Sequence, residues 1–150
     1  MLNDRYEVQT APDAETFAFD SVGPRGTVHK VVRYAEINIR NFYNLGFGDQ
    51  DELTGFLNDL TVTHNNDSRK VLATVAATLY AFTDNHPDAT IIATGSTAAR
   101  TRLYQMGIAG SLEEIKQDFE VLGLNADIEW EPFRKNITYG AFLVRRKLYI

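Results

Sequence analysis

Hydrophobic and polar positions alternate along much of the first third of the chain. Residues 6–10 (YEVQT), 16–22 (TFAFDSV) and 29–37 (HKVVRYAEI) are rich in β-branched and aromatic residues, which is typical of strands. The sequence GPRG at 23–26 predicts a turn between the second and third of these segments. The pattern therefore predicts a β-hairpin or meander near the N-terminus.

The next region gives weaker signals. Residues 41–52 (NFYNLGFGDQDE) place several turn-forming residues among aromatic ones, and we predict a loop that is packed down by Phe42, Tyr43 and Phe47. Residues 56–63 (FLNDLTVT) predict a strand, although their first half also suits a helix.

A helical spacing of apolar residues begins after residue 68. Spacings of three and four predict a buried helix over 69–85, and Asp67 or Ser68 can cap its first turn. Residues 90–95 (TIIATG) then predict a short buried strand. A buried helix that leads into a buried strand indicates a parallel β–α–β crossover. The apolar stripe of the helix comprises Val71, Leu72, Val75, Ala76, Leu79 and Phe82.

The last third of the chain predicts two more helices and two closing strands. One helix runs from Thr97 to about Gly107, and a second covers 111–124, where Ser111 and Glu114 have the spacing of a capping box. Residues 127–133 and 137–150 predict the strands. The whole pattern predicts one domain over 1–150 with an α+β fold: a mixed, mainly antiparallel sheet with a central buried helix and a β–α–β crossover. The apolar stripe of the helix predicted over 111–124 comprises Leu112, Ile115, Phe119 and Leu122.

Composition narrows the classes of function. The chain has 150 residues, of which 44% are hydrophobic, and a formal net charge of −5, so a generic nucleic-acid binder is disfavoured. It has no cysteine, which excludes disulfides, thiol catalysis and thiolate metal sites. The sequence shows neither a signal peptide nor an apolar run long enough to cross a bilayer. We therefore expect a cytoplasmic protein with no membrane contact.

The segment TGSTAARTRLY (94–104) predicts a candidate anion site. Ser96 and Thr97 lie at the start of a helix, where free backbone N–H groups and hydroxyls suit a phosphate or a carboxylate. Arg100 lies one turn further on and can add a charge-assisted contact. Helical spacing places Thr97, Arg100, Thr101 and Tyr104 on one face and predicts that Ala99, Leu103 and Met106 face the core.

A purely structural interpretation of the same segment stays open. In this interpretation Ser96 or Thr97 only caps the helix, the arginines pair with surface acids, and the ring of Tyr104 packs against its neighbours.

Ser68 and Arg69 form a second candidate at the start of the other helix. Because ligands tend to bind where parallel strands end, both helix starts can face one cleft, and Ser68 and Arg69 would then oppose Arg100. Asp67 would repel an anion there, and a turn with a helix cap also explains these residues.

The order of elements resembles the core of the GNAT acetyltransferases over roughly residues 56–108. The resemblance implies that HNNDSRK (64–70) lies where those enzymes grip the pyrophosphate of acetyl-CoA, and that Tyr104 matches a tyrosine that can act as a general acid. The glycine-rich phosphate loop expected before the helix is missing. The resemblance therefore favours a GNAT-like fold without conventional acetyltransferase activity.

Four motifs, GPRG, YNLGFGD, RKVLATVA and GSTAARTRLY, together resemble an uncharacterised bacterial family of about this length. This resemblance implies no known activity.

Binding of an anionic small molecule is the function that the sequence favours. The alternative is a non-catalytic protein-interaction module, such as a toxin–antitoxin or phage-defence component, and RNA binding through the arginines is a third. Asp49, Asp51 and Glu52 cluster in one segment, but their spacing does not match a calcium loop, so we predict no metal site. The sequence leaves open the cofactor and whether the protein is an enzyme.

Overall fold

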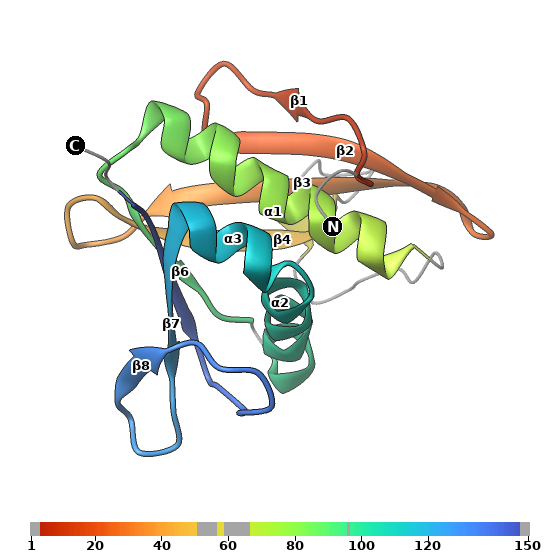
Figure 1. Ribbon diagram of the computed structural model, residues 1–150. Helices are drawn as coiled ribbons and strands as arrows, with labels where there is room; N and C mark the ends of the chain where they lie inside the picture. Colours follow the sequence, from red (N-terminus) through yellow and green to blue (C-terminus); the bar gives the residue numbers. More distant parts are fainter. Residues whose placement is uncertain (1–3, 51–56, 59–66, 96, 148–150) are drawn as a thin grey trace.

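A computed structural model describes residues 4–50, 57–58, 67–95 and 97–147. In these residues a nine-stranded sheet has the order β1-β2-β3-β4-β6-β9-β7-β8, with β5 also pairing with β4. Three helices pack against it (Figure 1). The α+β class and the mixed, mostly antiparallel sheet are as predicted. None of the described helices is both long and apolar enough to cross a membrane.

The first five strands form an antiparallel unit. β1 (Gln9–Thr10), β2 (Thr16–Gly23) and β3 (Gly26–Glu36) form the meander predicted from the alternating pattern. β4 (Phe42–Gln50) and β5 (Leu57–Asn58) extend it.

β4 corrects the prediction of a loop over 41–52. Its aromatic and aliphatic residues Tyr43, Leu45 and Phe47 alternate with Asn44 and two glycines, and all three are buried. This period of two is a strand pattern. Pairing with β3 over seven residue pairs outweighs the weak strand preference of the glycines, because strand propensity depends strongly on tertiary context.

The predicted crossover is present. α1 (Ser68–Asn85) leads to β6 (Thr90–Ala93), which pairs in parallel with β4. Of the stripe predicted for α1, Leu72 alone is only half-buried, while the other members reach the core. Asp67 is the N-cap residue of α1, but its side chain makes no capping hydrogen bond.

The chain continues through α2 (Ala98–Gly110) and a short α3 (Leu112–Asp118). It then forms β7 (Phe119–Leu124), β8 (Trp130–Pro132) and β9 (Phe142–Arg146), and β9 lies between β6 and β7.

The predicted helix over 111–124 was wrong in its second half. α3 ends at Asp118, because the backbone of the next residue, Phe119, is extended, and β7 pairs with both β8 and β9. Phe119 and Val121 then point into the core on a period of two while Glu120 stays exposed. Pairing with two neighbouring strands outweighs the helical spacing, which is a purely local signal. Ser111 precedes α3, but its side chain makes no capping hydrogen bond.

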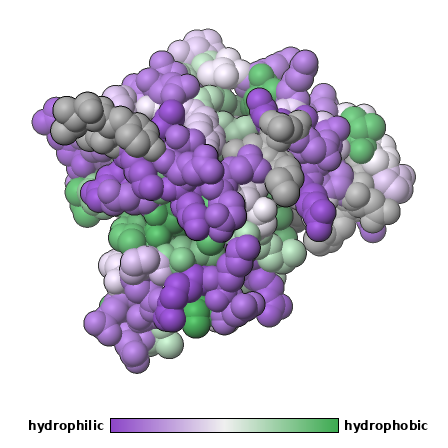
Figure 2. Space-filling view, in the orientation of Figure 1, coloured by the Kyte–Doolittle hydropathy of each residue, from purple (hydrophilic) through white to green (hydrophobic). Residues whose placement is uncertain are grey.

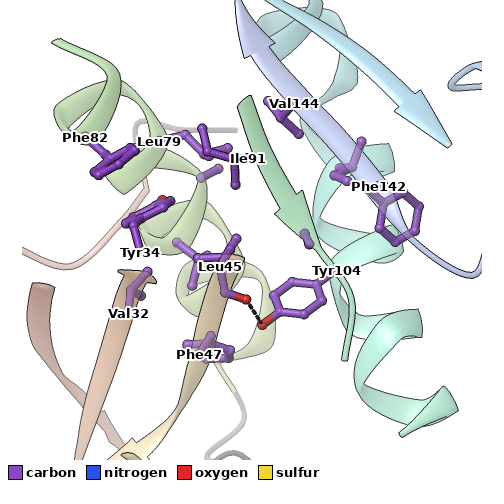
Figure 3. Close-up of a cluster of buried hydrophobic side chains, with 14 of the residues drawn as sticks. Val32, Tyr34, Leu45, Phe47, Leu79, Phe82, Ile91, Tyr104, Phe142 and Val144 are labelled. Atoms are coloured by element: carbon purple, nitrogen blue, oxygen red, sulfur yellow. Dashed lines mark hydrogen bonds between the residues drawn. The ribbon is translucent and has the colours of Figure 1, made fainter. Parts of the chain in front are cut away.

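The core lies between the sheet and the three helices. Tyr34 stacks on Phe82 at a ring separation of 4.2 Å, and its hydroxyl bonds with that of Thr78. Burial raises the pKa of Tyr34 well above its ordinary value. Figure 3 shows side chains from the sheet, α1 and α2 meeting in this core. All three helices contribute buried residues to the same cluster.

Gly95 brings the end of β6 against the first turn of α2. A Cβ at this position would lie 2.6 Å from the carbonyl carbon of Arg100, so the neighbouring backbone would have to shift. We expect Gly95→Ala to destabilise the fold by about 1–3 kcal/mol, measured by urea denaturation.

Gly110→Ala is the matched control, because a Cβ at Gly110 meets nothing within 4 Å. This variant should unfold at the wild-type urea concentration or slightly above it. Equal stability of both alanine variants would contradict the close approach at Gly95.

Candidate functional site

Several hydrogen bonds at the start of α2 are made within the segment itself. Thr97 is the N-cap, and its hydroxyl accepts a bond of 3.2 Å from the backbone N–H of Arg100. The N–H of Gly95 donates to the hydroxyl of Thr101 at 3.0 Å. Thr97 therefore caps the helix, as the structural interpretation predicts. Ser96 lies outside the described residues.

One edge of β4 explains where the side chains of α2 go. Asp49 of β4 pairs with Lys30 of β3 on one edge of β4 and with Asn58 of β5 on the other edge. β6 also pairs with β4 on the edge opposite β3, so β5 and β6 share that edge. β6 pairs with β4 only as far as Leu45. Between these two pairings the carbonyl of Phe47 accepts a hydrogen bond from Nη2 of Arg100.

Tyr104 reaches the same edge of β4 one turn further along α2. Its hydroxyl donates to the carbonyl of Leu45 over 3.4 Å, drawn as a dashed line in Figure 3. Arg100 and Tyr104 thus contact two carbonyls of β4 at and just beyond the end of its pairing with β6. Tyr104 is 8% exposed, which places its hydroxyl in the core.

The predicted inward face of α2 was wrong for most of its residues. Arg100, Thr101 and Tyr104 are buried, whereas Ala99 is exposed, Met106 is 53% exposed and Leu103 is half-buried. The physical reason is the pairing described above, since backbone carbonyls that lose a strand partner must be satisfied by other donors. Polar side chains of α2 supply those donors, so the polar face of this helix is the one that turns inward.

Arg100 is a buried cation with no counter-charge among the residues that the structure describes. The residue is only 6% exposed, and Nη1 has no hydrogen-bond partner among those residues. No carboxylate of the described residues forms an ion pair with it. Burying a charge is costly unless it is paired. An unpaired guanidinium of this kind is therefore suited to bind an anion.

A second buried cation lies on the other side of Phe47. Nζ of Lys30 is 5.9 Å from the centre of the Phe47 ring and 2.6 Å from a carboxylate oxygen of Asp49. Lys30 is 1% exposed. Three of the described charged side chains lie around Phe47: the cations Lys30 and Arg100 and the carboxylate Asp49. These three side chains together carry more positive than negative charge.

Lys30 and Asp49 were missed as a pair by the sequence reasoning. The signal that could have found Lys30 is its phase, because it shares the inward positions of its strand with Val32 and Tyr34. A lysine in this phase is expected to be buried with a partner. Asp49 was considered only for metal binding, and no cluster of the described residues could hold a metal ion.

Ser68 and Arg69 form the second candidate site. Both are exposed at the start of α1, and no hydrogen bond or ion pair of the described residues joins either of them to Arg100. The closest approach shown between the two helices is at Leu72 and Gly107, where a Cβ on the glycine would lie 3.3 Å from Leu72. Gly107 is about two turns beyond Arg100. The shared cleft stays a prediction.

A small apolar cavity of about 40 Å³ lies between α1, α2 and the sheet. Leu45 and Tyr104 line it, together with Val75, Ala76 and Ile108. In Figure 2 a band of apolar side chains crosses the middle of the molecule, between the polar surface over α1 and the polar surface near β8.

Comparison with known proteins gives a family and no activity. Residues 2–147 match the model of a family of unknown function, DUF6934. The chain belongs to this family. No curated protein and no solved structure matches the chain. For this member of DUF6934, the site must be interpreted from its own geometry.

Replacing Arg100 by methionine should stabilise the fold or leave its stability unchanged. Methionine keeps much of the side-chain volume and removes an unpaired buried charge, at the cost of one hydrogen bond to Phe47 worth about 1 kcal/mol. Urea denaturation without added anions, in a buffer that carries no phosphate, measures the free energy of unfolding.

A loss of more than about 3 kcal/mol in Arg100→Met would show that the guanidinium is a structural requirement. Tyr104→Phe serves as the comparison. It removes only the hydroxyl that contacts Leu45 and should cost about 1 kcal/mol.

Proposed function

We propose that the protein binds a small anionic ligand, carrying a phosphate or a carboxylate, at Arg100. The observation that carries this proposal is the buried Nη1 of Arg100, for which the described part of the chain offers no hydrogen-bond partner. An anion there would supply the missing counter-charge. It would accept a charge-assisted hydrogen bond, which is stronger than a bond between neutral groups.

The position of Arg100 in α2 supports the same ligand class. Arg100 is the third residue of the helix, so its side chain leaves the helix near the positive end of the dipole, where anions are stabilised.

Thr97 keeps a role in this proposal. Its hydroxyl accepts a bond from Arg100, and a hydroxyl that accepts one bond still has its own hydrogen to donate. Thr97 is exposed, so that hydrogen can reach a ligand at the start of α2. Ser96, Ser68 and Arg69 remain proposed ligand-binding residues on sequence grounds alone.

Catalysis is a less direct extension of the proposal. A GNAT-like architecture is supported by the crossover from β4 through α1 to β6 and by the helix that follows. Group transfer with Tyr104 as the acid would require its hydroxyl to leave the carbonyl of Leu45 and meet a substrate. Ligand binding without conventional acetyltransferase activity fits the buried hydroxyl better. A cytoplasmic location and a bacterial origin belong to this proposal and rest on the sequence.

An interaction module is the second candidate function. It is favoured by half-buried apolar residues on the face of the sheet that is opposite the helices, including Leu122 and Leu143.

The test is thermal denaturation with phosphate, sulfate, acetate, CoA, acetyl-CoA and ATP, followed by calorimetric titration of any anion that stabilises the protein. A ligand at 100 times its Kd should stabilise the wild type by about 2.7 kcal/mol. The shift should vanish in Arg100→Met. Stabilisation by acetyl-CoA above that by CoA would favour the GNAT-like ligand.

Arg102→Met is the matched control, since Arg102 is an exposed arginine of the same helix. It should keep the full ligand-induced shift. The proposal is wrong if no anion stabilises the folded wild type, or if Arg100→Met responds as the wild type does.

A further inference from the structure

The face of the sheet opposite the helices carries an apolar row. In β6, β9 and β7 the buried residues Ile91, Val144 and Val121 belong to the core. Their sequence neighbours point to the opposite face, because side chains alternate along a strand. Register places these neighbours side by side, Ile92 with Leu143, Leu143 with Leu122, and Leu122 with Pro132.

A second apolar pair extends the row. Leu124 pairs with Trp130 on the same face, and Trp130 is 43% exposed. We call this surface the outer face; its six residues are Ile92, Leu122, Leu124, Trp130, Pro132 and Leu143.

No helix of the described residues covers the outer face. Each of the three helices contributes buried apolar residues, among them Leu79, Tyr104 and Ile115, to the core cluster on the opposite face. An antiparallel sheet whose open face meets water normally carries polar residues there. A contiguous apolar surface instead marks a site of interaction.

The β7–β8 hairpin at the end of this face carries an unusual residue. The carbonyl of Asn125 accepts from the N–H of Ile128, and the N–H of Asn125 donates to the carbonyl of Glu129. This is a three-residue hairpin loop with a bulge, whose third loop position is left-handed and ordinarily holds glycine. Ile128 occupies that position with φ of 60° and is 77% exposed.

The conformation of Ile128 is costly for a β-branched residue, and its exposed side chain gains little burial in return. The loop is nevertheless well fixed, since the side chain of Asn125 accepts from the N–H groups of Asp127 and Glu129. Strain of this kind tends to be retained where the side chain has a function. Ile128 and Trp130 together therefore present apolar surface at the edge of the outer face.

We propose that the outer face is the interface of a symmetric homodimer, in which two copies of this chain pack sheet against sheet. A second copy fits because the proposed interface is apolar and the charged residues beside Leu122 and Leu143 on this face, Glu120 and Arg145, lie 2.7 Å apart as a neutral pair. Two chains that each carry a net charge of −5 repel each other in general, so they approach best through a surface without net charge.

The geometry favours packing of faces over pairing of edges. β8 is the edge strand on this side of the sheet, and it contains Pro132. Proline has no N–H to donate to an added strand and discourages edge-to-edge association. A two-fold axis through the outer face would instead place the apolar rows of two copies against each other, as in a β-sandwich.

Sedimentation velocity of the full chain from low micromolar to several hundred micromolar tests the dimer. The wild type should shift with concentration to twice the chain mass of 16.9 kDa. Leu143→Lys should weaken dimerisation at least about 100-fold, since a two-fold axis brings two buried lysines together. Circular dichroism checks that this variant is folded.

Val22→Lys is the matched control, because Val22 is an exposed apolar residue (61%) of β2 outside the outer face. It should dimerise as the wild type does. The proposal is overturned if the wild type stays monomeric at every concentration, or if Leu143→Lys dimerises as strongly as Val22→Lys.

The role of Ile128 is tested separately in the monomeric Leu143→Lys background. There Ile128→Gly should raise Tm by about 2–4 °C, because glycine adopts the left-handed conformation freely. In the otherwise wild-type chain the same substitution should weaken the dimer by several-fold. A lower Tm in the monomer, or an unchanged dimer, would remove Ile128 from the interface.

Discussion

The edge of β4 is the constraint on which the candidate site depends. β6 runs parallel to β4 and leaves it after Leu45, and β5 joins the same edge only at Asp49. The carbonyls of Leu45 and Phe47 then take hydrogen bonds from Tyr104 and Arg100 of α2. A buried backbone carbonyl without a partner costs free energy comparable to a lost hydrogen bond. This requirement draws polar side chains of α2 into the core.

Satisfying a carbonyl with an arginine has an electrostatic consequence. A neutral donor would have met the same hydrogen-bonding need, as the hydroxyl of Tyr104 does for Leu45. The guanidinium of Arg100 brings a full charge into a buried place, where Nη1 has no partner among the described residues. Lys30 differs, because Asp49 neutralises it at 2.6 Å. This contrast between the two buried cations is the basis of the proposed anion binding.

The sheet serves two surfaces with different chemistry. Its inner face packs against three helices and holds both the aromatic core and the buried cations. Its outer face carries Ile92, Leu122 and Leu143 in one row across three strands. Because the two faces alternate residue by residue along the same strands, residues 91–93 of β6, 121–124 of β7 and 142–144 of β9 are consecutive apolar or glycine residues, as in strands that are buried on both sides. Ligand binding at Arg100 and association through the outer face are therefore compatible in one molecule.

The sequence by itself determined the elements with a clear period. The spacing in α1 and the alternation in β2 and β3 are local patterns that the core then uses, and the parallel crossover followed from the order of the elements. It also indicated that Ser96 or Thr97 can cap α2, because the preference of these residues for a helix start depends on the nearest turn alone, and the structure gives Thr97 as the cap. The likeness to an uncharacterised family held over most of the chain, since residues 2–147 match one family model.

Only the tertiary structure decided the elements whose local signal competes with long-range pairing. Residues 119–124 carry helical spacing, yet two neighbouring strands make them β7, and the glycines of β4 form a strand because β3 pairs with them. The inward turn of Arg100 likewise depends on a carbonyl 53 positions away in the chain. Spacing along a helix shows which residues share a face but not which face is buried. In α2 the buried face is decided by the β4 carbonyls that β6 leaves without a partner, and the position of those carbonyls depends on the whole sheet.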